Sequence, residues 1–351
     1  MDLLLKINNL SIDYETKAGP VHAVEDVSFT LRKGESLGLV GESGCGKTTL
    51  AKTIMRMGAE NCVIPQGEIL FNGKDIVKMS KEEIRKLRLN DIAMVSQSAM
   101  NALNPVYRVG DQIIEGIMAH TKMTKKEAYD RTVEVFDIIG LKPDRMDAHP
   151  HQMSGGMKQR AVIAMALSLN PELIIADEPT TALDVVVQDR ILKQIKEVLG
   201  KFNSSMIFIT HDIAVVSEVC ETILVMYGGK IMEKANTKVF FKKPFHPYSL
   251  GLHNASPSIL DIGKELISIP GTPPNLIEKQ FGCRFKERCP FRTDKCMNEE
   301  PNLTPIDEND HLIACHYPER VEEFREKTQH KETWDVVRDR IEMEREVIVH
   351  G

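Results

Sequence analysis

The stretch Gly41-Glu42-Ser43-Gly44-Cys45-Gly46-Lys47-Thr48 decides the fold of this chain. It fits the phosphate-loop pattern G-x-x-x-x-G-K-[ST] at every position, follows the apolar run 37–40 and precedes a helical pattern. Its glycines let backbone N–H groups turn toward phosphate oxygens, and the helix directs its positive end at the same anion. Lys47 can supply a charge for the β- and γ-phosphates, and the Thr48 hydroxyl can ligate Mg²⁺. The stretch therefore predicts a nucleotide-binding loop.

Apolar segments elsewhere predict the sheet around this loop. Three nearly continuous apolar runs, at 173–176, 206–209 and 223–226, alternate with helical patterns. Such runs are typical of parallel strands that are covered on both faces. Strands are also expected at 27–31, which alternates, and at 69–71, which runs into an Asn-Gly turn. The pattern predicts an α/β fold.

Two acidic residues, Asp177 and Glu178, end the first of these apolar runs. Asp177 can hold the shell of a Mg²⁺ ion, and Glu178 can polarise an attacking water. Taken alone, an Asp-Glu pair after a strand is more often a solvated turn. It gains weight here because a phosphate loop precedes it by about 130 residues.

A second candidate anion site is Ser154-Gly155-Gly156, which opens a helical stretch that ends before Pro171. Two glycines at a helix start leave backbone N–H groups free to meet an anion. The alternative for an isolated Ser-Gly-Gly is a flexible hinge.

Composition limits the class of protein. The chain has 351 residues, which at about 150 residues per domain suggests two domains. Its formal net charge of −6 argues against a broadly basic nucleic-acid binder. The longest apolar run, 161–167, is far short of the roughly 20 residues of a membrane span, and an acid stands near the N-terminus where a signal peptide has basic residues. We therefore expect a cytosolic protein without a transmembrane segment of its own.

The composition changes near residue 244, where a proline-rich stretch begins, and four of the seven cysteines then fall between 283 and 315. We place a domain boundary there, with domains at 1–243 and 244–351. Near the end, Trp334, Val337 and Ile341 are spaced for one face of a helix. That face is expected to pack on its own domain, with a partner contact as the alternative.

The chain resembles the ABC ATPases in the order of its motifs, which are the phosphate loop, Ser-Gly-Gly, Asp-Glu, residues 181–184 and a late histidine. The resemblance covers about 1–243 and implies a mostly parallel sheet with an antiparallel β subdomain and a helical subdomain at about 98–168. It also implies that the chain binds and hydrolyses ATP with Mg²⁺. The residues that it implies for ATP are Tyr14 (adenine), Gly41, Glu42, Ser43, Gly44, Cys45, Gly46, Lys47, Thr48, Thr49, Gln97 and His211.

Further roles follow from the same resemblance. It implies that Gln97, Thr48 and Asp177 meet Mg²⁺, and that Glu178, His211 and Gln97 serve catalysis. Ser154, Gly155 and Gly156 match the signature that binds ATP held by an opposite subunit, and Asp184 matches the aspartate at the dimer interface. The usual signature is Leu-Ser-Gly-Gly-Gln, and methionine stands at both ends of it here, so no side-chain role is carried over to Met157.

Five segments narrow the resemblance to oligopeptide/dipeptide permease ATPases: 41–46, 97–105, 149–152, 245–249 with its His-Pro-Tyr, and 269–274 with its Pro-Gly-Thr-Pro-Pro. This resemblance extends to about 316. It implies the motor subunit of a peptide importer, peripheral on the cytoplasmic face of the membrane. The implied partners are a second ATPase subunit (related or identical), two transmembrane permease subunits and, indirectly, a substrate-binding protein. Importers of oligosaccharides or nickel, or a soluble ABC ATPase without a transport role, are the alternatives.

The remaining motif is Cys283, Cys289, Cys296 and Cys315, with the spacing C-x5-C-x6-C-x18-C. Thiols gathered in a proline-rich stretch suggest a metal staple. Zinc sites usually use shorter knuckles, and wider spacings suit an iron–sulfur cluster. The permease ATPases that the chain resembles carry a [4Fe–4S] cluster in this region, which favours iron–sulfur, with zinc as the alternative. The three basic residues between the first two cysteines, at 284, 286 and 288, are candidates to offset a cluster's charge.

Overall fold

Strand β3 (Ser36–Val40), which leads into the phosphate loop, lies inside a mixed sheet. The computed structural model describes residues 2–96, 102–181, 184–255, 267–307 and 310–350. In it, β3 pairs in parallel with a strand on either side, and two further parallel strands extend the sheet, which confirms the predicted parallel arrangement. These neighbours are β9 (Thr222–Tyr227), β8 (Ser205–Thr210), β7 (Leu173–Asp177) and β6 (Ile92–Val95).

The other edge of this sheet is antiparallel. Strand β10 (Lys230–Asn236) forms a hairpin with β9, and two short strands from the C-terminal region, β12 (Leu312–Ile313) and β11 (Thr304–Pro305), pair beyond it. Sequence reasoning missed this extension because two-residue strands have no measurable periodicity. The last third of the chain therefore contributes strands to the same sheet that carries the phosphate loop.

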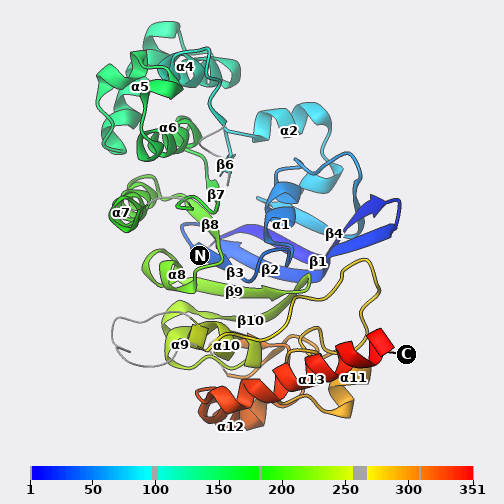
Figure 1. Cartoon of the computed structure of the whole chain (residues 1–351). Helices are drawn as coiled ribbons and strands as arrows, with labels where there is room; N and C mark the ends of the chain where they lie inside the picture. The colour runs from blue at the N-terminus through cyan, green and yellow to red at the C-terminus, as the bar shows by residue number, and fades with distance from the viewer. Residues whose placement is uncertain (1, 97–101, 182–183, 256–266, 308–309, 351) are drawn as a thin grey trace.

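A separate antiparallel sheet lies beside helix α1 (Lys47–Ile54), as Figure 1 shows. Two of its strands contain the segments 27–31 and 69–71, which confirms the predicted strands. Apolar residues of this sheet, of α1 and of one face of the large sheet form one buried cluster. In spatial order its strands are β2 (Gly19–Arg32), β1 (Leu3–Thr16), β4 (Cys62–Phe71) and β5 (Lys74–Asp75).

Helices cover the opposite face of the large sheet, and a second buried cluster joins them to it. Along β7, Leu173 and Ile175 belong to the first cluster while Ile174 and Ala176 belong to the second, so the strand is buried on both faces. Capping boxes at Ser80 and Thr124 begin α2 and α5. Helix α2 (Lys81–Leu87) belongs instead to the first cluster, through Ile84 and Leu87. The helices that contribute to the second cluster are α4 (Val109–His120), α5 (Lys125–Ile138), α6 (Gly155–Leu167), α7 (Val185–Phe202) and α8 (Ile213–Val219).

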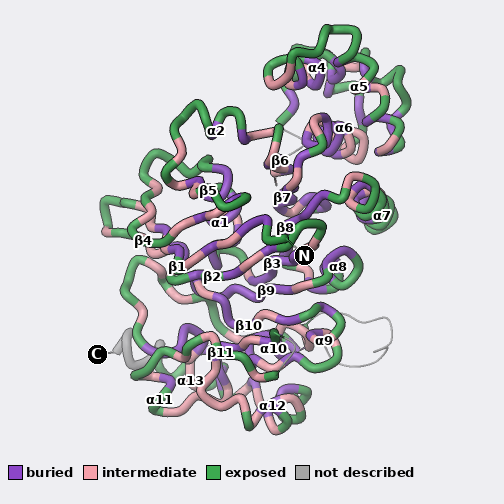
Figure 2. The backbone as a smooth tube through the Cα atoms, turned by 180° about the vertical axis from the view of Figure 1, so that it is seen from behind, coloured by how far each residue is buried: buried purple, intermediate pink, exposed green. Residues whose placement is uncertain are grey.

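The C-terminal region packs at the end of the molecule opposite to α4 and α5 (Figure 1). Trp334 and Val337 are buried on the chain itself, as the helical spacing predicted. Figure 2 shows that burial is continuous from the large sheet into this region, and Phe285 and Trp334 share the core cluster of the cassette helices. Its helices are α9 (Thr237–Lys242), α10 (Pro247–Ala255), α11 (Asp294–Asn298), α12 (Val321–Lys327) and α13 (Lys331–His350).

Short 3₁₀ turns complete the described structure: η1 (Ile76–Lys78), η2 (Pro143–Asp147), η3 (Pro150–Gln152) and η4 (Pro318–Arg320). Among the described residues, none of the helices combines the length and the apolar character that a membrane crossing requires. A domain boundary near 244 remains a prediction.

Candidate active site

Two glycines of the phosphate loop stand where no side chain fits. A Cβ at Gly41 would lie 2.2 Å from the carbonyl oxygen of Met226, and one at Gly46 would lie 2.4 Å from that of Ala23. Gly46 also has φ +102, a left-handed conformation that is strained for other residues. The loop is thus pressed against β2 and β9, which fixes its path before α1 begins.

Lys47, the first residue of α1, is buried against its own loop. Its Nζ donates hydrogen bonds to the carbonyl oxygens of Gly41 (2.7 Å) and Glu42 (2.9 Å), and it lies 3.5 Å from the sulfur of Cys45. The ammonium group is therefore held inside the curve of the loop, where a phosphate oxygen can approach it.

Thr48 and Asp177 meet across the site. The Thr48 hydroxyl donates a 3.1 Å hydrogen bond to Oδ1 of Asp177, which ends β7 and is almost fully buried. Burial raises the pKa of the Asp177 carboxyl, and the Thr48 hydrogen bond opposes that shift. A hydroxyl and a carboxylate in contact are oxygen donors of the kind that Mg²⁺ prefers.

Glu178 follows directly and has a left-handed backbone, with φ 49. Its Oε1 lies 3.2 Å from Nδ1 of His211, and its Oε2 accepts a 3.0 Å hydrogen bond from the Thr181 hydroxyl. The Glu178 N–H donates to the carbonyl of Ile209 on β8, which anchors the turn to the sheet. The structure thus joins the predicted Glu178 and His211, whereas Gln97 lies outside the described residues.

One cavity of about 270 Å³ gathers most of the predicted nucleotide residues. Tyr14 lines it from β1, and its hydroxyl donates a 3.2 Å hydrogen bond to the Thr49 hydroxyl. Gly41, Glu42 and Cys45 are not among the residues that line it. The lining residues are Tyr14, Val21, Ala23, Ser43, Gly44, Gly46, Lys47, Thr48, Thr49, Glu178 and Leu276.

Sequence reasoning missed three of these lining residues. Val21 and Ala23 lie on β2, and Leu276 comes from the C-terminal region, held by a 2.8 Å hydrogen bond from the His22 N–H to its carbonyl. No sequence motif identifies them, because an apolar residue that lines a nucleotide cavity looks the same in the sequence as an apolar residue of the core.

The Ser-Gly-Gly segment and Asp184 line a different cavity, of about 300 Å³. Ser154 caps α6, and its hydroxyl accepts a hydrogen bond from the N–H of Met157. Asp184 caps α7 in the same way through Val187. Two helix N-termini therefore face one open space, which shares no lining residue with the first cavity.

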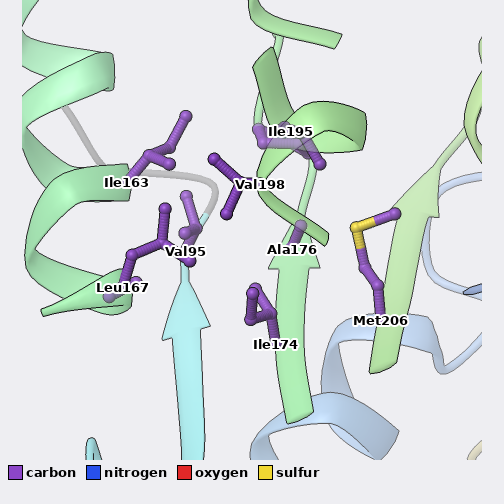
Figure 3. Close-up of a pocket in the computed structure, with 10 residues that line it drawn as sticks. Val95, Ile163, Leu167, Ile174, Ala176, Ile195, Val198 and Met206 are labelled. Atoms are coloured by element: carbon purple, nitrogen blue, oxygen red, sulfur yellow. The ribbon is translucent and has the colours of Figure 1, made fainter. Parts of the chain in front are cut away.

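The strand that ends in Asp177 supports both helices. Figure 3 shows Ile163 and Leu167 of α6 and Ile195 and Val198 of α7 around a closed apolar space over β6, β7 and β8. Its volume is about 20 Å³, so it is a packing void at the scale of one water. The contacts tie the C-terminal halves of α6 and α7 to the strand that carries the acidic pair.

The four clustered cysteines line one small cavity in the C-terminal region, together with His246, Phe285 and other side chains. Burial raises the pKa of the Cys283 thiol to about 12 and that of Cys315 to about 11. Within the described part of the chain, no three His, Cys, Asp or Glu side chains are grouped so that they could hold a metal ion. The four cysteines predicted to bind iron–sulfur or zinc thus line one space, but the described side chains are not grouped so that they could hold a metal ion.

The chain matches known proteins along most of its length. Residues 24–181 match the ABC transporter family, and residues 232–296 match the family described as the C-terminal region of oligopeptide/dipeptide transporters. It is 45% identical over 303 residues to the oligopeptide transport ATP-binding protein OppD of Salmonella typhimurium. The aligned residues are 86% of this chain and 90% of that protein. The chain belongs to the family of oligopeptide and dipeptide transport ATP-binding proteins.

Another member of this family and two solved ABC cassette structures are also similar to the chain. The dipeptide transport ATP-binding protein DppD of Bacillus subtilis is 44% identical over 319 residues, 90% of this chain and 95% of that protein. A dimeric structure of MJ0796, a bacterial ABC transporter cassette, superposes with a TM-score of 0.61 at 25% identity, over 67% of this chain and 99% of that one. A post-hydrolysis state of the same cassette, bound to ADP and Pi, scores 0.61 at 26% identity over the same shares of the two chains. The transport ATP-binding protein described here is an ABC ATPase.

Proposed function

We propose that this chain is the ATP-hydrolysing motor subunit of a membrane importer for dipeptides or oligopeptides. The observation that carries the proposal is the match outside the cassette: residues 232–296 fit the C-terminal region of oligopeptide/dipeptide transporters. An ATPase of another kind, such as a soluble ABC protein, would need only the cassette. Importers of oligosaccharides or nickel remain the alternatives among transporters, since the ATPase subunit holds no substrate site that distinguishes them.

In this proposal Glu178 polarises the water that attacks the γ-phosphate, and His211 orients the reacting groups. Their 3.2 Å contact at the edge of the nucleotide cavity supports the pairing. Lys47 and the loop N–H groups hold the phosphates, and Tyr14 stacks on the adenine. Thr48 and Asp177 would hold Mg²⁺, which neutralises phosphate charge when bound, and Gln97 is proposed to complete that set.

A single chain offers the phosphate loop and the signature in two separate cavities. We infer that two ATPase subunits pair head to tail, so that Ser154, Gly155 and Gly156 of each meet the ATP held by the other, with Asp184 at the interface. The second subunit is a related chain or a second copy. Two transmembrane permease subunits hold the pair at the cytoplasmic face of the membrane, a substrate-binding protein delivers the peptide, and no nucleic acid takes part.

For the C-terminal cysteines we propose a [4Fe–4S] cluster that staples the region together. Four thiols around one cavity, three of them buried, match the donor set of such a cluster. The wide spacing of the cysteines along the chain favours such a cluster over zinc, whose structural sites usually use shorter knuckles. Deprotonated thiolates would replace thiols whose pKa burial raises, so binding the group would release protons.

The proposed function is tested in cells that lack this gene. They are expected to lose uptake of labelled dipeptides and oligopeptides and to become resistant to toxic peptide analogues, and the wild-type gene should restore both. The Glu178→Gln gene should not restore them. Normal peptide uptake in the deletion strain, with loss of sugar or nickel uptake instead, would contradict the peptide assignment and leave the ATPase assignment intact.

A further inference from the structure

The residue Glu42 of the phosphate loop is held from three directions. Its carboxylate accepts two hydrogen bonds from the guanidinium of Arg288, Nη1 to Oε2 at 2.6 Å and Nη2 to Oε1 at 2.9 Å. Its N–H donates to the Tyr248 hydroxyl at 3.0 Å, and its carbonyl accepts from Lys47 Nζ at 2.9 Å. Two of these three partners belong to the C-terminal region, more than 200 residues away along the chain.

Arg288 is itself fixed. It is 3% exposed, its Nε donates to the carbonyl of Pro270 at 2.8 Å, and Nη2 also reaches the carbonyl of Ile269 at 3.2 Å. Its guanidinium lies over the ring of Tyr227 on β9, at 5.6 Å from the centroid, and Nη1 contacts the hydroxyl of that residue at 3.3 Å. A planar guanidinium group whose three nitrogens all donate hydrogen bonds can hold a carboxylate in only one orientation.

The charge of Glu42 explains why such a clamp is needed. The loop that carries it receives a polyphosphate, and an unpaired carboxylate there would repel the ligand. A bidentate arginine cancels this charge and at the same time fixes the first turn of the loop. From the sequence, Arg284 and Arg288 are expected to offset a cluster's charge. In the structure, Arg284 pairs with Glu25 and Arg288 pairs with Glu42.

We propose that Arg288 is a positioning residue of the ATP site, which sets the phosphate loop for nucleotide through Glu42. The C-terminal segment that carries Arg288 then contributes to ATP binding. Arg288 also stands next to Cys289, which lines the cysteine cavity, so the segment that forms the ion pair and the segment that lines the cavity are continuous.

The test is a cycle of variants in the full-length protein, with ATP hydrolysis measured as a function of ATP concentration. Arg288→Met is expected to raise KM for ATP about tenfold or more, with a smaller effect on kcat, because the partly buried carboxylate of Glu42 is left unpaired in the loop that receives the phosphates. Adding Glu42→Gln removes that charge and should bring KM most of the way back. A purely structural arginine would leave the double variant as impaired as the single one.

Arg284→Met is the matched control. Arg284 is equally buried in the same segment and pairs with Glu25 and Glu300, away from the phosphate loop. It should lower thermal stability to a similar extent while KM stays within about twofold. A KM for Arg288→Met within twofold of wild type overturns the proposal. If Arg288→Met does not fold, Arg288→Lys decides: it keeps the charge but not the fork, so a rise in KM supports the proposal and an unchanged KM overturns it.

Discussion

Glu178 sits where β7 has ended and the chain turns in a left-handed conformation, with its carboxylate between Thr181 and His211. A left-handed glutamate costs on the order of 1 kcal/mol, and such strain persists where the surrounding contacts hold it. Here the N–H bond to Ile209 and the two side-chain contacts supply that restraint. At this scale the chemistry depends on one carboxylate at a fixed place.

Glu178→Gln is expected to bind ATP normally and to lower kcat by about 10²-fold or more, because the amide cannot accept a proton from water. Retained ATP should stabilise a dimer, measured by size-exclusion chromatography with ATP and Mg²⁺. The control is Glu172→Gln, just before the same strand, where Glu172 forms a half-exposed ion pair with Lys33. That variant should hydrolyse ATP at the wild-type rate; a Glu178→Gln protein with normal turnover would show that Glu178 is not the base.

His246 predicts a pH dependence of stability. It is buried, its Nδ1 accepts a 3.1 Å hydrogen bond from the Tyr248 N–H, and burial lowers its pKa to about 4. Since unfolded histidine titrates near 6.5, the unfolded state binds more protons between pH 6.5 and 4. The stabilising contribution of neutral His246 is therefore complete above pH 6.5 and is lost as pH falls toward 4, by on the order of 3 kcal/mol.

Urea denaturation at pH 7 and pH 4.5 measures this loss. His246→Asn, whose side-chain oxygen can accept the same N–H, should lose clearly less stability over that range than the wild type. The exposed His330 supplies the control, since His330→Asn should follow the wild-type curve. Equal pH dependence in His246→Asn and wild type would mean that His246 is not a buried neutral histidine.

At the scale of elements, the apolar runs at 173–176, 206–209 and 223–226 identified β7, β8 and β9 because their signal is local. Strands β11 and β12 escaped prediction because two-residue strands, β12 beside β10 and β11 beside β12, are selected by tertiary contact alone. The acidic pair and the phosphate loop were found by motif. Leu276 and Arg288 were not, since their place at the ATP site depends on how a distant segment folds back.

The segment before α4 is expected to receive the permease. Val106 and Tyr107 are apolar and exposed, at 73% and 59%, whereas Leu103 of the same segment is 3% exposed and part of the core. A charge at Leu103 would therefore damage folding and test nothing else. Tyr107→Asp is the better probe: it should abolish peptide uptake and leave the basal ATPase rate within about twofold, because only the docking surface changes.

The control is Tyr129→Asp, since Tyr129 is similarly exposed, at 48%, on α5 of the same helical region. It should leave both uptake and ATPase activity unchanged. Loss of ATPase activity in isolated Tyr107→Asp protein would show that the segment supports the catalytic site instead of a permease contact.

At the scale of the whole molecule, the C-terminal region is joined to the cassette by strand pairing, by a shared core and by the Arg288–Glu42 ion pair. The cysteine cavity lies in that region and includes His246 of the His-Pro-Tyr segment. A cluster bound there would stabilise the same elements that hold the phosphate loop.

Protein purified without oxygen is expected to be brown and to contain about four irons per chain. Cys289→Ser should lose the colour and lower the melting temperature, while Cys220→Ser, at a buried cysteine outside the cavity, should keep both. Colourless protein with one zinc per chain, or with no metal, would contradict the iron–sulfur proposal.

The most direct test of the account is ATP-driven transport by the reconstituted complex. The chain, its ATPase partner and its permease subunits are placed in liposomes, and accumulation of a labelled peptide is followed together with ATP hydrolysis. We predict that peptide delivered by its binding protein enters only with ATP, that it raises the ATPase rate, and that Glu178→Gln abolishes its accumulation. Hydrolysis that proceeds at the same rate with and without peptide, with no accumulation inside the vesicles, would contradict the account.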